Sequence, residues 1–120
     1  MAKNRTPRIE GEMKRALSEI LLTELKDPRV SDMLGIMRVE VTPDLKFAKV
    51  FVSVYDEEER AEATMEALTR AEGFIRAKLN ERIKLRRIPN LTFVHDRSIA
   101  YSAHILELID RVNRQEGDEK

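Results

Sequence analysis

Two neighbouring segments in which apolar and polar residues alternate constrain the fold of this chain more than any other feature. In residues 37–41, and again in residues 47–55, every second side chain is apolar, which is the period of a strand with one buried face. Residues 42–45 are typical of a turn, because Pro43 stands where proline presets the backbone angle. The sequence therefore predicts an antiparallel hairpin. We expect helices to cover the aliphatic face of the second strand, formed by Ala48, Val50, Val52 and Val54.

Apolar residues at helical spacing predict a first helix before this hairpin. We expect it over residues 8–26, ending at Asp27 because Pro28 biases that residue away from helical angles. Residues 29–35 should then form a loop that ends at Gly35. The buried stripe of the helix should consist of Ile9, Met13, Ala16, Leu17, Ile20, Leu21 and Leu25.

Two more helices and a strand are expected after the hairpin. Acidic residues 56–59 favour the positive end of a helix dipole and open the second helix. Gly73 interrupts the helical pattern, and glycine inside a helix costs about 1 kcal/mol relative to alanine. We therefore expect a kink or a close backbone contact there, followed by a third helix over residues 74–84. A third strand over residues 90–96 and a last helix over residues 99–112 complete the pattern.

These elements predict one α+β domain, with a three-stranded sheet that carries its helices on one face. The 120-residue length suits a single domain, which we place at residues 8–112, between flexible ends at residues 1–7 and 113–120. The absence of cysteine excludes disulfides and thiolate zinc sites. No apolar run approaches the ~20 residues that span a bilayer, and no signal peptide follows Met1. We therefore expect a cytoplasmic protein that does not enter membranes.

The charges balance overall, with 22 basic and 22 acidic residues, but they are segregated along the chain. Residues 74–97 carry seven basic side chains against two acidic ones, and residues 56–72 carry seven acidic against two basic. A polyanion responds to the local field rather than to the total charge. We expect the cationic groups to gather along the bent pair of helices and the acidic ones elsewhere. From charge alone, an ordinary solvated surface is an equally good interpretation.

The basic run over residues 82–89 is the strongest local signal. Cations at the end of a helix also complement its dipole, but Arg86 and Arg87 exceed that need. We favour contacts with RNA phosphates, which bind without reading base sequence. The expected phosphate contacts are Arg76, Lys78, Arg82, Lys84, Arg86 and Arg87, with Lys14, Arg15 and Lys49 as weaker candidates. Phe51 should lie beside Lys49 on the open sheet face, where cross-strand packing is a better interpretation than base stacking.

Catalytic patterns are weak. His95, Asp96 and Ser98 invite comparison with a triad, but neighbours on a strand point to opposite faces, and no glycine-rich elbow presents Ser98. His95 and His104 have no recognisable metal-ligand spacing. We expect no enzyme, no metal and no cofactor. A hydrolase that uses His95 and Ser98 is the rival, and it requires the two side chains to lie within hydrogen-bond reach.

Five stretches, in order and at matching spacing, carry a family resemblance. They are residues 26–29, 38–45 together with 48–53, 71–76, 85–93 and 96–98. Through them the chain resembles the bacterial ribosome-binding factor A family over nearly its full length. The resemblance implies a KH-like domain of the second topological type. An Ala-x-Gly kink replaces the usual Gly-x-x-Gly loop in this family, and it corresponds here to Ala71, Glu72 and Gly73.

The resemblance also implies a function. The family binds the small (30S) ribosomal subunit and its 16S rRNA, assists late maturation and processing of the RNA 5′ end, and supports growth in the cold. For this chain it implies a monomeric assembly factor in the cytoplasm, with an assembly GTPase as a further candidate partner. The alternative is a protein–protein interaction module that uses the open sheet face or the acidic helix and does not bind RNA directly.

Overall fold

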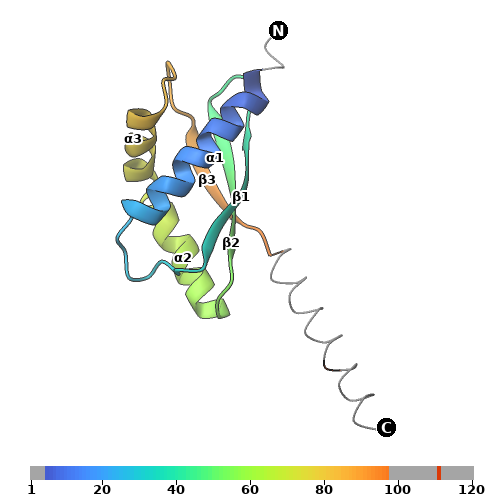
Figure 1. Ribbon diagram of the computed structural model, residues 1–120, viewed down its shortest axis with the longest axis vertical. Coiled ribbons are helices and arrows are strands. Elements are labelled where there is room, and N and C mark those ends of the chain that lie inside the picture. The colour runs from blue at the N-terminus through green and yellow to red at the C-terminus, as the bar shows by residue number, and fades with distance from the viewer. Residues whose placement is uncertain (1–4, 98–110, 112–120) are drawn as a thin grey trace.

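The structure, a computed structural model, describes residues 5–97 and Arg111 (Figure 1). Its elements are α1 (Arg5–Thr23), β1 (Leu34–Val41), β2 (Phe47–Val54), α2 (Glu58–Arg70), α3 (Glu72–Arg82) and β3 (Asn90–His95). This order confirms the predicted succession of helix, hairpin, two helices and strand. The expected last helix over residues 99–112 and the expected tail over residues 113–120 lie outside the described residues, except for Arg111, which is helical.

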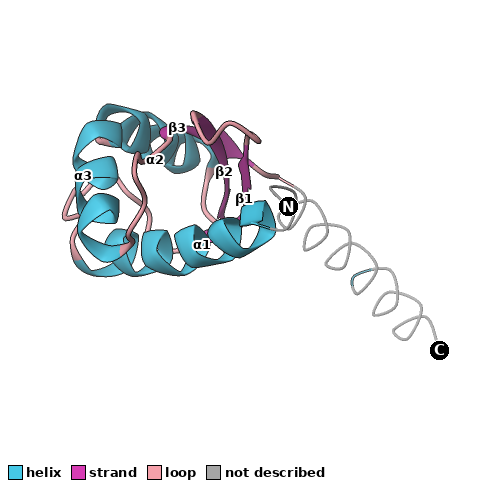
Figure 2. Ribbon diagram, turned by 90° about the horizontal axis from the view of Figure 1, so that it is seen from above, coloured by secondary structure: helices cyan, strands magenta, loops and turns pink. Residues whose placement is uncertain are grey.

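The three strands form one sheet in the order β1–β2–β3. β1 and β2 pair antiparallel, as the short turn predicted, and β2 and β3 pair parallel. The described helices lie on the same side of the sheet, and none of them covers the other side (Figure 2). The α+β prediction with helices on one face is thus confirmed. The helix-facing side chains of β2 are the expected Ala48, Val50, Val52 and Val54, all buried.

The core lies between this sheet face and the three helices. Met13, Leu17 and Ile20 of α1 are completely buried, as are Leu68 of α2 and Ile75 and Leu79 of α3. Each such side chain contributes about 1.5–3 kcal/mol by leaving water. Phe93 of β3 is partly buried against the same core, and Leu91 is buried in it. The core therefore fixes α1 and α3 against each other above the sheet.

The first helix differs from its predicted bounds at both ends. It begins at Arg5, so residues 5–7, which we expected to be flexible, form its first turn. Proline is tolerated in a first turn, because its missing N–H would lack a helical partner anyway. The helix ends at Thr23, where the amides of Glu24 and Leu25 both donate to the carbonyl of Ile20, at 2.9 and 3.1 Å. The second of these bonds closes a π-turn, a type of turn that occurs at helix C-termini.

The first strand begins at Leu34 rather than Met37, and Gly35 lies inside it, paired with Ser53. The register shifts between Ile36 and Arg38, which marks a β-bulge. Before the bulge Leu34 and Ile36 pair with buried residues of β2, and after it Val39 and Val41 do so. The extra residue breaks the alternation, and for that reason the period of two predicted only the second half of the strand.

The predicted kink between the second and third helices is confirmed, and it centres on Ala71. That residue has φ −89° and ψ 6°, between α2, which ends at Arg70, and α3, which begins at Glu72. Gly73 is exposed in the first turn of α3, and a Cβ built on it would meet no described residue within 4 Å. The described residues therefore make no close backbone contact at Gly73, and the kink is the alternative that they support.

Hydroxyl groups attach the loop between α1 and β1 to α2. The buried Thr64 hydroxyl accepts the amide of Ser31 at 2.9 Å, and the Ser31 hydroxyl donates to Asp56 at 2.7 Å. Earlier in the loop, Arg29 forms two side-chain hydrogen bonds with Asp27, at 3.0 and 2.7 Å. These bonds lower the pKa of Asp27 from 3.8 to about 2. The loop consequently presents β1 in a fixed position.

Candidate nucleic-acid interface

The segment between α3 and β3, residues 83–89, is called the basic loop below. It begins where Ile83 takes an extended conformation and donates its amide to Leu79, at 3.0 Å, which ends the helix. Ile83 and Leu85 pack against the core, and Ile88 is buried in it. Because these apolar side chains point inward, the cationic ones point out. The outward residues are Lys84, Arg86 and Arg87.

These three cations have no ion pair with a described residue. The basic loop protrudes at one end of the molecule, at the top of Figure 1, near the first half of α1. Exposed and uncompensated guanidinium groups are suited to bidentate contacts with phosphate oxygens. The basic loop therefore presents the positive charge that the sequence predicted.

One further predicted residue joins the basic loop. Arg15 of α1 and Lys84 line the same groove, which has a volume of about 300 Å³. Arg15 is exposed and, like Lys84, forms no ion pair with another residue of the described part. Glu12 and Glu19 also line this groove and reduce its net positive charge. The groove extends the cationic surface from the basic loop onto the first helix.

The predicted cations of α3, unlike those of the basic loop, form ion pairs with acidic residues of the described part. Arg82 forms ion pairs with Glu19 of α1 at 2.9 Å and with Glu24, directly after α1, at 3.2 Å. Lys78 lies 3.8 Å from Glu24 and 3.6 Å from Glu81. The expected separation of cations along the helix pair from acids elsewhere is therefore wrong at α3, because Glu19 of α1 and Glu24 directly after it face α3. A phosphate would have to compete with these carboxylates.

Arg76 belongs to a network that positions the end of the basic loop. Its guanidinium lies 3.3 Å from Glu72 and donates to the side chain of Asn90 at 2.6 Å. The same Glu72 accepts the amide of Leu91 at 2.9 Å. Two residues of α3 thus hold the first residues of β3, and with them the basic loop. Among the described residues, this gives Arg76 and Glu72 a structural role.

The two other weak candidates lie apart from the basic loop. Lys14 shares its helix face with Ser18, four residues on, which lines a groove beside β1. Lys49 is exposed on the open sheet face, between Glu40 and Thr92 on the neighbouring strands. The predicted neighbour Phe51 is covered by Arg38, whose guanidinium carbon lies 3.7 Å from the ring centroid. This favours the packing interpretation of Phe51 over base stacking.

Sequence reasoning missed Lys46. Its carbonyl accepts the amide of Asn90 at 3.0 Å, which brings the hairpin turn next to the end of the basic loop. Lys46 is exposed and has no ion pair with a described residue. Only the parallel pairing of β2 with β3 creates this proximity, and no local pattern in the sequence signals it.

The hydrolase alternative cannot be built from the described residues. Ser98 and His104 lie outside them. His95 lies on β3, partly buried, and its Nε2 atom has no hydrogen-bond partner among the described residues. Between residues 5 and 97, no group of three or more His, Asp or Glu side chains could hold a metal ion. No helix in that range is long and apolar enough to cross a membrane.

The order of the elements and the one-sided sheet define a KH-like domain of the second topological type, with a break between α2 and α3 at Ala71 and the basic loop after α3. The profile of the family described as ribosome-binding factor A matches residues 5–109. The chain belongs to the ribosome-binding factor A family.

Curated relatives and solved structures agree with this assignment. Ribosome-binding factor A of Caldanaerobacter subterraneus subsp. tengcongensis is 44% identical over 115 residues, which cover 96% of this chain and 94% of the relative. The crystal structure of ribosome-binding factor A from Thermus thermophilus has a TM-score of 0.66 at 34% identity, covering 75% of this chain and 93% of that one.

A Thermus thermophilus homology model fitted into the cryo-EM map of a complex between the 30S subunit and ribosome-binding factor A is also similar. It has a TM-score of 0.63 at 37% identity, over 75% of this chain and 93% of that one. The solution structure of a Thermotoga maritima protein, described as a putative ribosome-binding factor A, has a TM-score of 0.67 at 34% identity, over 75% of this chain and 85% of that one.

Proposed function

We propose that this chain binds the small (30S) ribosomal subunit during its assembly and contacts 16S rRNA through the basic loop. The observation that carries the proposal is the set of exposed cations Lys84, Arg86 and Arg87, which form no ion pair with the described residues and are held outward by the buried Ile88. The Thermus thermophilus relative fitted into a map of a 30S complex supports the choice of partner. Arg15 and Lys46 extend the contact, whereas Lys14, Lys49 and the ion-paired Arg76, Lys78 and Arg82 contribute less.

The proposed action is binding, not catalysis. A domain that neutralises phosphates holds rRNA in one arrangement, and this would assist late maturation and processing of the 16S rRNA 5′ end. The proposal includes action as a monomer in the cytoplasm, without a cofactor, with growth in the cold as the condition of greatest need. An assembly GTPase remains a candidate partner.

The test is co-sedimentation with purified small subunits. The double variant Arg86→Glu/Arg87→Glu should lose at least tenfold in affinity, because two phosphate contacts become repulsive. The matched control is Lys26→Glu/Arg70→Glu, which changes the net charge equally. Lys26 has no ion pair with a described residue, and the Arg70–Glu66 pair is exposed on both sides, so that it contributes little stability.

Circular dichroism should show both variants folded, because all four side chains are exposed. Wild-type affinity of the Arg86→Glu/Arg87→Glu variant, or an equal loss in the control, would reject the basic loop as the contact. If the chain binds assembly proteins and shows no salt-sensitive affinity for purified 16S rRNA, the interaction-module alternative is correct.

A further inference from the structure

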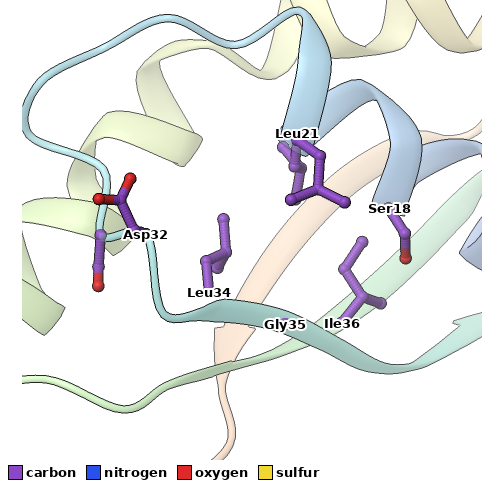
Figure 3. A pocket seen from close by; sticks show the side chains of 8 residues that line it. Ser18, Leu21, Asp32, Leu34, Gly35 and Ile36 are labelled. Carbon is purple, nitrogen blue, oxygen red and sulfur yellow. The ribbon is translucent and has the colours of Figure 1, made fainter.

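A second surface lies where α1 ends and β1 begins, away from the basic loop (Figure 1). A groove of about 340 Å³ opens there between the two elements, and it is mostly apolar. Figure 3 shows Leu34 and Ile36 rising from β1 toward Leu21 of α1, with Asp32 at one end. Beside it, Leu22 is 78% exposed and Met33 is 57% exposed. Such large apolar side chains at the rim of an open groove are typical of a docking site.

The backbone beside this groove is an open sheet edge. β1 is an outer strand, and the carbonyl of Met33 accepts the amide of Tyr55, so it points toward β2. Because the direction of these groups alternates along a strand, the N–H and C=O groups of Leu34 and Ile36 point away from β2. No described residue bonds to them. An unpaired edge of this kind accepts a further strand.

The other half of the same edge is partly occupied. The carboxylate of Glu10, on α1, accepts the amide of Val41 at 2.7 Å, and the bulge at Met37 separates this half from the first. The open stretch is therefore short and lies directly beside the apolar groove. Backbone groups and apolar pocket together form a site for a short extended peptide.

The charge around the groove selects the chemistry of that peptide. Residues 24–33 and 55–62, which flank it, carry eight acidic against three basic side chains. Two of the bases are paired, Arg29 with Asp27 and Arg60 with Asp56. Glu24 and Glu58 are paired with bases from outside these segments, so four acids remain against one base. Asp32 lines the groove itself, and Asp56 is bonded to Ser31, which also lines it. An acidic rim repels nucleic acid and attracts a cationic chain.

We propose that this groove binds a basic, extended segment of a partner protein, which adds as a strand to Leu34–Ile36 and places an apolar side chain between Leu21 and Leu22. Main-chain hydrogen bonds to the β1 edge hold the segment, the pocket takes an apolar residue, and Lys or Arg side chains face the acidic rim. The surface is separate from the basic loop, so the domain can join rRNA and a protein at the same time.

The probe is a blocked seven-residue peptide of alternating valine and lysine, titrated into the ¹⁵N-labelled full chain. We expect saturable shifts of the Leu34 and Ile36 amides. A peptide N-methylated on its bonding edge, and a peptide with glutamate in place of lysine, should each bind at least tenfold more weakly. Equal binding of either control peptide, or no shift at these two amides, overturns the proposal. A single-stranded oligouridylate that shifts the same amides would also overturn it, because the occupant would then be RNA.

Variants locate the site on the chain. Leu22→Ser should weaken binding of the valine–lysine peptide about tenfold, because the apolar contact is lost. The matched control is Phe47→Ser, which removes another exposed apolar side chain, 55% exposed, at the start of β2. It should leave the affinity unchanged, and equal losses in both variants overturn the proposal. Arg86→Glu/Arg87→Glu should bind the peptide normally, so the failure of this inference and that of the proposed rRNA contact are distinguishable.

Discussion

At the scale of single residues, one buried hydroxyl determines how the loop before β1 is held. Thr64 is fully buried in α2, and its hydroxyl accepts the amide of Ser31 while it lies 2.8 Å from the carbonyl of Arg60. Thr64→Val keeps the shape but leaves the Ser31 N–H unpaired. We expect a loss of about 1–3 kcal/mol in the free energy of unfolding, measured by urea denaturation.

Thr69 provides a control on the same helix. Its hydroxyl donates to Met65 at 3.0 Å and is exposed, so water replaces the lost bond in Thr69→Val. Thr69→Val should change the free energy of unfolding by no more than about 0.5 kcal/mol. Equal losses at both positions would show that the effect comes from valine in the helix and not from Ser31. The sequence did not predict which of the two threonines is buried, because neither residue type nor local pattern shows whether a threonine hydroxyl faces the core or the solvent.

At the scale of the elements, the periodicity of apolar residues predicted every helix and strand in the described part, but not all of their ends. The stripe from Ile9 to Leu25 and the aliphatic face of β2 are where the pattern placed them. The start of β1 was missed because the bulge at Met37 shifts the alternation by one residue. The start of α1 was missed because a proline in a first turn resembles the end of a loop.

The break between α2 and α3 leads to a prediction about glycine. Because the break centres on Ala71 and a Cβ at Gly73 meets nothing within 4 Å, Gly73→Ala should stabilise the domain by about 0.5–1 kcal/mol. Gly11→Ala, also in a helix with open space, should give the same gain. Gly35→Ala should gain less than either, since its Cβ would lie 3.3 Å from the Ser53 hydroxyl, which must shift to make room.

Urea denaturation of the three variants checks this prediction. Gly73→Ala should also leave binding to small subunits unchanged, because the Arg76–Glu72 and Arg76–Asn90 contacts do not involve Gly73. A loss of stability or of binding in Gly73→Ala alone would show that the glycine itself sets the angle between the helices, as the family resemblance suggested.

At the scale of the whole molecule, the distribution of charge is the feature that the sequence predicted least well. Local counts correctly marked residues 84–87 as cationic, because three basic residues lie within four positions and no acid is adjacent. Counts of charged residues along the sequence could not show that Glu19 and Glu24 face Arg82. These acids precede Arg82 by about sixty positions, and the contact follows from the packing of α1 on α3. Nor could the counts place Arg15 beside Lys84. Long-range packing thus divides one cationic stretch into paired and unpaired groups.

This division predicts how binding to purified 16S rRNA depends on salt. Each phosphate contact contributes about 0.7–0.9 to the slope of log K against log salt concentration, because counterions are released. Arg86→Gln and Arg87→Gln should each reduce the slope by about that amount, whereas Lys78→Gln should leave it unchanged, since Lys78 lies between Glu24 and Glu81. Filter binding over a series of potassium chloride concentrations measures all three. An equal reduction in Lys78→Gln would mean that phosphate displaces the carboxylates, and that α3 itself faces the RNA.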